Sequence, residues 1–202
     1  MPKIYPNQES TTSSDQCLSN CNKRETYTVW MKSLVLHSNG CTVYNSNGKI
    51  VYRVDNYDRK GSREVNLMDL QGNLLCTIKK RLLAFGCWKG HKYCRNSNSR
   101  NQDQQPWFEV KRCNKIITGK IACQIKMGSQ KLCIERMSIG KSLAFRIVNK
   151  LDGKIIAEAK QKQSSSGVVL SNDVLTLNLA AGTDHSLIMA LITVYGLICG
   201  LM

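Results

Sequence analysis

The sequence predicts a mainly β domain, an antiparallel barrel of strands closed around one apolar helix near the C-terminus. Apolar and polar residues alternate through many short segments after residue 27, as in strands with one buried and one solvated face. Turns that contain Asn or Asp and end in Gly separate several of these segments. A run of 17 residues without a charged side chain, 186–202, follows the last segment.

The chain divides into a polar lead and one globular domain. Residues 1–24 are rich in Ser, Thr, Asn and Gln, and we expect them to be disordered. Residues 25–202 contain all of the alternating segments and are numerous enough to bury a substantial core. The polar N-terminal segment does not resemble a secretory signal, so we expect a cytoplasmic or nuclear protein with reduced thiols.

The strand predictions rest on side-chain alternation. In 174–179, three leucines share one face, and Thr176 and Asn178 share the other. Segment 121–127 repeats the pattern, with Ile121, Cys123, Ile125 and Met127 on its apolar face, and 143–147 repeats it again. One apolar face and one wet face favour an antiparallel sheet that covers a single core.

Three turn segments, 45–48, 69–72 and 151–153, join pairs of predicted strands. Each ends in Gly, which adopts a positive φ readily, and each contains Asn or Asp. This succession predicts a meander of hairpins. Residues 95–105 are wholly polar and predict a long exposed loop, and 164–167 predict a second loop.

The uncharged C-terminal segment predicts a helix over about residues 184–200. Thr183 or Asp184 can cap its N-terminus, and the carboxylate of Asp184 also suits the helix dipole. A helix of about 17 residues is about 25 Å long, which matches a barrel of ordinary strand length. We therefore expect it to fill the barrel. The alternative, a membrane anchor, is less favoured because such helices need about 20 apolar residues.

Residue patterns for catalysis or for metal binding are missing from the sequence. The ten cysteines include no C-x-x-C pair, and we interpret Cys76 and Cys123 as small buried hydrophobic residues. The three histidines are far apart in sequence, and His185 suits a capping or interior role. We therefore expect no enzyme, no cofactor and no metal, although a cysteine nucleophile assembled in space stays open.

The net charge of +15 is concentrated in the middle of the chain. Residues 61–162 hold 21 Lys and Arg against seven Asp and Glu, a net +14. A positive field of this kind favours phosphoinositides, acidic membrane surfaces or nucleic acid. The alternative is that these charges are scattered, solubilising side chains on outward strand faces.

The densest basic cluster lies around the apolar segment 82–85. Basic side chains beside exposed aromatic residues suit a lipid headgroup at a membrane interface. The alternative is a solvated hairpin in which Phe85 and Trp88 are core residues. The predicted headgroup-binding residues are Lys79, Lys80, Arg81, Lys89, His91, Lys92 and Arg95.

Five segments together resemble the plant LURP-one-related family. They are 30–34 (WMKSL), 43–48 (VYNSNG), 52–57 (YRVDNY), 67–72 (LMDLQG) and 184–189 (DHSLIM). That family is similar to the tubby C-terminal domain and the phospholipid scramblases. The resemblance implies a tubby-like barrel of about twelve antiparallel strands that encloses a hydrophobic C-terminal α-helix.

The resemblance also implies a function, although similarity of fold is weak support for one. The leading hypothesis is a non-catalytic, monomeric module that binds anionic phospholipids or phosphoinositides, is peripheral at the plasma membrane, and regulates transcription or plant defence. One alternative is a scramblase-like lipid carrier whose C-terminal helix is inserted in the membrane. A second is a non-specific nucleic-acid-binding protein, although no recognition motif is present. Protein partners are not identified by the sequence.

Overall fold

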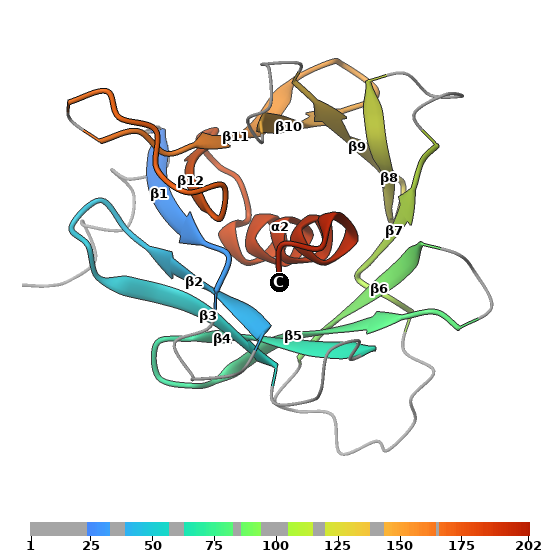
Figure 1. The fold of residues 1–202 in the computed structure, drawn as a ribbon. Helices are drawn as coiled ribbons and strands as arrows, with labels where there is room; N and C mark the ends of the chain where they lie inside the picture. The colour runs from blue at the N-terminus through green and yellow to red at the C-terminus, as the bar shows by residue number, and fades with distance from the viewer. Residues whose placement is uncertain are drawn as a thin grey trace, which may run out of the picture.

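The computed structural model describes residues 24–32, 39–56, 63–82, 86–93, 105–114, 120–137, 144–164 and 166–202. Within these ranges the chain forms a closed antiparallel barrel around one helix, α2 (His185–Cys199), as predicted (Figure 1). The strands are β1 (Glu25–Trp30), β2 (Asn39–Tyr44), β3 (Ile50–Asn56), β4 (Glu64–Asp69), β5 (Leu74–Lys80), β6 (Cys87–Lys92), β7 (Phe108–Arg112), β8 (Ile121–Met127), β9 (Gln130–Arg136), β10 (Ala144–Asn149), β11 (Ile155–Gln161) and β12 (Val174–Leu179). Each strand pairs with its sequence neighbours, and β1 pairs with β12 to close the barrel.

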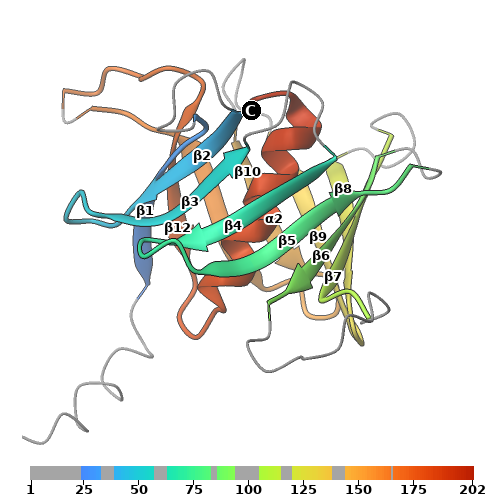
Figure 2. The same ribbon diagram turned by 90° about the horizontal axis from the view of Figure 1, so that it is seen from below.

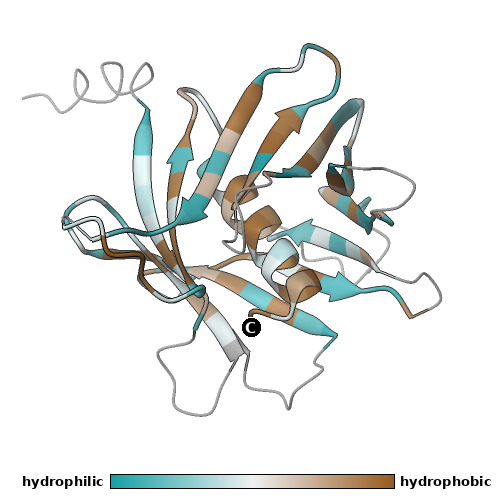
Figure 3. Cartoon of the chain, turned by 45° about the horizontal axis from the view of Figure 1, so that its top comes forward, coloured by the Kyte–Doolittle hydropathy of each residue, from teal (hydrophilic) through white to brown (hydrophobic). Residues whose placement is uncertain are grey.

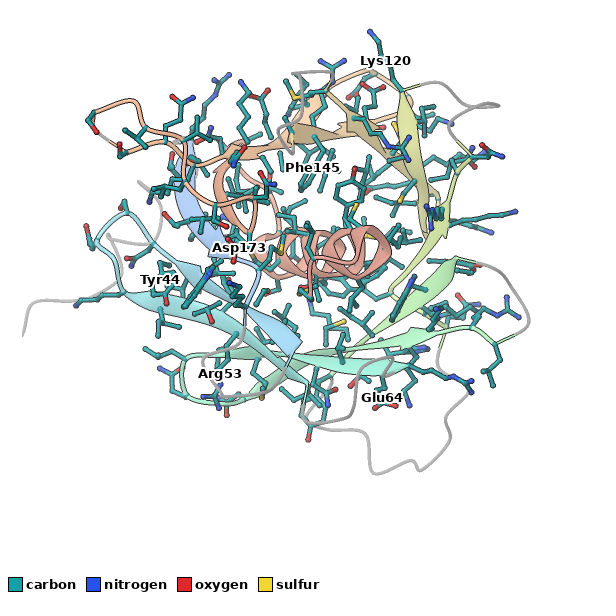
Figure 4. All side chains as sticks on the ribbon, viewed as in Figure 1. Tyr44, Arg53, Glu64, Lys120, Phe145 and Asp173 are labelled. Atoms are coloured by element: carbon teal, nitrogen blue, oxygen red, sulfur yellow. The ribbon has the colours of Figure 1, made fainter. Side chains whose placement is uncertain are left out.

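The apolar helix lies inside the barrel, which confirms its predicted role as the core. Every residue from Leu187 to Gly196 is buried, so α2 needs apolar surroundings on all sides. The strands supply them: the ring of Phe145 points inward, with its centroid 4.5 Å from that of Tyr195 on α2 (Figure 4). Figure 3 shows the brown, hydrophobic helix surrounded by strands on which hydrophobic and hydrophilic residues alternate.

Strand alternation follows the prediction in β12 and departs from it in β8. Leu175, Leu177 and Leu179 are fully buried, whereas Asn178 is exposed. In β8 the register with β9 shifts between Ile121 and Cys123, so that Ala122 is buried as well as Cys123. The extra residue is a β-bulge, which alternation in the sequence does not reveal.

The predicted turns form as expected from their glycines. Gly48, Gly72 and Gly153 have φ values of 73°, 81° and 69°. The side chain of Asn45 accepts hydrogen bonds from the N–H groups of Asn47 and Lys49, both at 3.0 Å. These local bonds hold the hairpins before any long-range packing is needed.

A different glycine, Gly90 in β6, is required by packing. It lies opposite Phe108 of β7, and a Cβ atom at this position would lie 2.2 Å from the Phe108 ring. The ring therefore covers the bare backbone of β6 and fills the barrel interior at this level. Cys76 and Cys123 are also fully buried, as predicted, and burial raises the pKa of each thiol to about 12.

Two residues cap α2 and define the two ends of the barrel. The Asp184 carboxylate accepts a hydrogen bond of 3.1 Å from the N–H of Leu187, and Gly200 ends the helix with a φ of 70°. We call the end near Asp184 the N-cap end and the end near Gly200 the C-cap end. The predicted helix range of 184–200 thus runs from cap to cap.

Strand direction determines which turns share an end. Odd-numbered strands run from the N-cap end to the C-cap end and even-numbered strands return, because all neighbours are antiparallel. The described turn residues 81, 82 and 86, between β5 and β6, and 162–164 and 166–173, between β11 and β12, therefore lie at the C-cap end. The turns 45–49, 70–73 and 150–154 lie at the N-cap end (Figure 2).

Candidate functional site

The strongest charge cluster of the described residues surrounds the turn between β5 and β6 at the C-cap end. The strand register places Glu64, Lys79 and Lys89 side by side on the outer face of β4, β5 and β6. Lys80 is opposite Trp88, and its N–H donates to the carbonyl of Arg63. We call the cations gathered here the basic rim: Arg63, Lys79, Lys80, Arg81, Lys89, Lys111 and Arg112.

Backbone hydrogen bonds position Arg81 and Arg112, two further members of the basic rim. The N–H of Arg81 donates to the carbonyl of Cys87 at 2.9 Å, and Lys111 of β7 is opposite Cys87 on the other side. The N–H of Arg112 donates to the carbonyl of Gly86, also at 2.9 Å. Three strands and their turns therefore bring cations from residues 63 to 112 to one edge of the barrel.

Like charges lie directly opposite one another in the basic rim. Lys79 and Lys89 are cross-strand partners, and side chains at such positions are about 5 Å apart at Cβ. The same arrangement recurs at Lys126 and Lys131 on β8 and β9. Pairs of this kind destabilise a sheet. In the basic rim, each of these two lysines also has a carboxylate opposite it on its other side, Glu64 beside Lys79 and Glu109 beside Lys89.

Most cations of the basic rim have no acidic partner within the described parts of the chain. Lys79 is the exception, because its Nζ lies 3.1 Å from the Glu64 carboxylate. No described carboxylate forms an ion pair with Lys80, Arg81, Lys89, Lys111 or Arg112. These charges are consequently available to an external anion.

The pKa of His91 responds to the positive charges on the outer face of β5 and β6. Burial lowers the pKa of its imidazole, and the charges of Lys79 and Lys89 lower it further. His91 therefore stays neutral at neutral pH, and the positive charge of this face comes from lysine and arginine.

The predicted site residues separate into three groups. Lys79, Lys80, Arg81 and Lys89 belong to the basic rim, and His91 lies on the same outer face of β6 as Lys89. Lys92, the last residue of β6, lies at the N-cap end, with its Nζ 3.9 Å from Asp184 and 5.0 Å from the Trp107 ring centroid. Arg95 lies outside the described residues, as does Phe85.

Trp88 is not the exposed aromatic residue that the headgroup-site hypothesis expected. Its side chain is only 5% exposed and belongs to the core, as the alternative interpretation proposed. It still contacts the rim, because the Nζ of Lys80 lies 5.8 Å from the Trp88 ring centroid. The exposed apolar side chain beside the rim is instead Leu82, in the turn after Arg81.

Three rim residues, Arg63, Lys111 and Arg112, were not predicted. A meander of hairpins does place β4 and β7 beside the β5–β6 pair, so their proximity has a signal in the sequence. The strand register that brings these three residues to one end of the barrel has no signal in the sequence, because it depends on pairing between distant strands.

The N-cap end holds a second polar cluster, around His185. Its Nδ1 lies 3.3 Å from the Tyr27 hydroxyl, and its Nε2 lies 3.5 Å from the Glu25 carboxylate. The Tyr27 hydroxyl also donates to Glu25, and burial raises the tyrosine pKa. These contacts fix the start of α2 to β1, so His185 has the structural role that the sequence indicated.

Metal binding and membrane spanning find no support in the described ranges. No three His, Cys, Asp or Glu side chains there are grouped so that they could hold a metal ion. Among the same residues, no helix combines the length and the apolar character that a membrane crossing requires.

The architecture defines a class of protein: a twelve-stranded antiparallel barrel that encloses its own C-terminal helix. A solved X-ray structure of an Arabidopsis thaliana protein has the same fold, with a TM-score of 0.60 over 90% of this chain and 95% of that one, at 12% identity.

The sequence profile of LURP-one-related proteins matches residues 25–196, and the chain belongs to the LURP-one-related family. Protein LURP-one-related 4 of Arabidopsis thaliana is 46% identical over 186 residues, 89% of this chain and 80% of that protein. Protein LURP-one-related 11 from the same plant is 35% identical over 208 residues, 98% of this chain and 89% of its own length.

Proposed function

We propose that the protein is a non-catalytic module that binds anionic phospholipid headgroups at the basic rim. The observation that carries this proposal is the set of rim cations without acidic partners, arranged around the directly opposed pair Lys79 and Lys89. An anion with several phosphate oxygens would bridge these cations and relieve their mutual repulsion. Phosphoinositide headgroups have this chemistry and occur at the cytoplasmic membrane surface.

The geometry favours a headgroup over a small metabolite. Most of the rim side chains are exposed at the edge of the barrel, whereas small-molecule sites are usually enclosed and mostly apolar. Ligand binding at such an edge depends on charge, so affinity should fall as salt screens it. The proposed role is attachment to an acidic membrane surface and, by extension, membrane-tethered regulation of transcription or defence.

Vesicle flotation tests the proposal directly. The full chain should float with vesicles of phosphatidylcholine that contain phosphatidylinositol bisphosphate, and should stay behind with phosphatidylcholine alone. The double variant Lys80→Glu/Arg81→Glu should weaken binding at least about tenfold, since each basic residue near an acidic surface contributes about 1 kcal/mol. Both side chains are exposed, so the fold should be preserved.

A matched control has the same charge change at the opposite end. Lys49→Glu/Lys154→Glu alters two exposed lysines in turns at the N-cap end and should bind nearly as well as the unaltered chain. Equal loss in both double variants would show that net charge alone matters. That result would overturn the proposal of a specific rim.

The two alternatives from the sequence are further outcomes of this experiment. Tighter binding to duplex DNA than to vesicles at equal salt would favour a nucleic-acid-binding protein. A scramblase-like carrier would need α2 in the bilayer. Because α2 is packed within the barrel, this would require the barrel to open, and vesicle binding should then abolish the compact fold.

A further inference from the structure

A second surface at the C-cap end has a different chemistry from the basic rim. The turn between β11 and β12 extends as a hairpin, described over residues 162–164 and 166–173, that stands away from the barrel wall in both side and end views (Figures 1 and 2). Its returning arm carries three consecutive apolar side chains, Val168, Val169 and Leu170, which are 62%, 51% and 37% exposed. Residues 163–172 include no charged side chain.

Exposure of this apolar arm is built into the hairpin. The N–H of Ser164 donates to the carbonyl of Val168 at 2.8 Å, and the N–H of Leu170 donates to the carbonyl of Lys162 at 2.9 Å. The Gln161 side chain donates to the carbonyl of Leu170 at 2.6 Å. Because the Val168 carbonyl and both backbone groups of Leu170 are already paired, entry of the arm into a less polar medium costs less than it would for an unpaired loop.

A hollow of about 350 Å³ lies between the hairpin and the outer face of β11 and β12. Val169 lines one side, and Lys160, Thr176 and Asn178 line the other. The one charged residue of this lining, Lys160, is paired with Glu158, so the feature of this surface that suits the acyl region of a membrane interface is the exposed apolar arm.

The balance of charges at the C-cap end indicates what kind of partner it fits. Counted over the described turns and terminal strand residues, the C-cap end has eight cations and two carboxylates. The cations are Lys32, Arg63, Lys80, Arg81, Arg112, Lys120, Arg136 and Lys162, and the carboxylates are Glu64 and Asp173. Both carboxylates are already paired with lysines, Glu64 with Lys79 and Asp173 with Lys32. A surface that combines apolar protrusions with this charge is complementary to an anionic bilayer.

We infer that the protein docks on an anionic bilayer with its C-cap end, and that the hairpin arm Val168–Leu170 inserts into the interface. Leu82, 71% exposed in the turn beside the rim, is a second inserted side chain across the barrel. Two insertion points at one end would set the barrel upright on the membrane. This inference rests on the proposed function and adds to it the end of the barrel that faces the membrane and the side chains that insert into it.

The test uses the full chain and the double variant Val168→Ser/Val169→Ser. Its affinity for vesicles containing phosphatidylinositol bisphosphate should fall about tenfold, because each valine loses apolar contact with the interface. Its affinity for soluble inositol trisphosphate, measured by calorimetry, should be unchanged. Leu70→Ser/Leu151→Ser is the matched control, since both leucines are exposed, at 56% and 77%, in turns at the N-cap end.

The outcomes separate the inference from the function on which it rests. Unchanged vesicle binding by Val168→Ser/Val169→Ser, with the headgroup still bound, overturns the insertion and leaves headgroup binding intact. Absence of binding to both vesicles and inositol trisphosphate by the unaltered chain overturns the proposed function. Loss of binding in both leucine and valine variants would indicate a partner without a preferred end, such as another protein, and would also overturn the inference.

Discussion

The two ends of the barrel differ in the balance of cations and carboxylates that they carry and in how those charges are paired. Over the described turns and terminal strand residues, the N-cap end has five cations (Arg24, Lys49, Lys92, Lys150 and Lys154) and four carboxylates (Glu25, Asp69, Asp152 and Asp184). Each of these carboxylates bonds to a neighbouring group that defines a turn, a cap or a strand contact. The C-cap end has eight cations, and its two carboxylates are already paired.

This difference between the two ends distinguishes charged side chains that stabilise the fold from charged side chains that are available for binding. At the N-cap end the polar groups hold the start of α2 against β1 and β6 through Glu25, His185 and Lys92. At the basic rim Lys79 pairs with Glu64, whereas Lys80, Arg81, Lys89, Lys111 and Arg112 form no ion pair with a described carboxylate. The predictions below would break or sharpen this contrast.

The largest effect is expected from removal of the helix that connects both ends. A chain that stops after Thr183 loses every buried side chain of α2, from Leu187 to Tyr195. The barrel would then enclose a void, so it should unfold or aggregate. Circular dichroism and analytical ultracentrifugation of the truncated chain check this. A soluble, cooperatively folding truncation would contradict the core role of α2 and would favour a membrane anchor.

Loss of the N-cap should reduce stability without altering binding. Asp184→Ala removes the hydrogen bond to the N–H of Leu187 and the ion pair with Lys92. We expect a loss of about 1 kcal/mol in the free energy of unfolding. Urea denaturation measures it, and vesicle flotation should be unaffected.

Lys80→Ala is the comparison variant at the other end. It should change the free energy of unfolding by less than about 0.5 kcal/mol, as is usual at exposed positions. Vesicle binding should nonetheless weaken. If Lys80→Ala were the more destabilising of the two variants, the assignment of structure to one end and binding to the other would be wrong.

A smaller effect concerns acid stability. In the folded chain the pKa of His91 lies below its ordinary value of 6.5, so the unfolded chain binds the proton more readily. The His91 contribution to stability is therefore complete above pH 6.5 and is lost as pH falls from that value through the lower folded pKa. His91→Asn should make denaturation midpoints less dependent on pH in this window. An unchanged pH dependence would show that the pKa of His91 is not lowered in the folded chain.

The smallest effect is on the titration of His91 itself. Lys89→Met removes one of the two lysine charges that lower its pKa, so the pKa should rise toward the ordinary value. A pH titration of the imidazole proton signals by NMR measures this. Lys154→Met, which removes an exposed charge in a turn at the N-cap end, should leave the His91 titration unchanged.

Local patterns predicted much of the fold, and long-range register explains what they missed. The leucines of β12, the turn glycines and the Asp184 cap are decided by neighbours in sequence, and each was found at its predicted place. The gathering of Arg63 and Arg112 beside Lys80 depends on how distant strands align. The exposure of Val168–Leu170 also escapes prediction, because three apolar residues in a row normally indicate a buried strand.

Closure of the barrel by β1 and β12 has a consequence for how the chain reaches its folded state. Glu25 pairs with Leu179, so the strand that forms first on the ribosome waits for one translated last before its ladder is complete. The helix that fills the barrel, α2, is synthesised later still, so until then the barrel lacks its core and unpaired strand edges can pair with other chains. Folding should accordingly be slow and dependent on contacts distant in sequence. Chaperone assistance during synthesis would therefore affect yield more than the final stability would suggest.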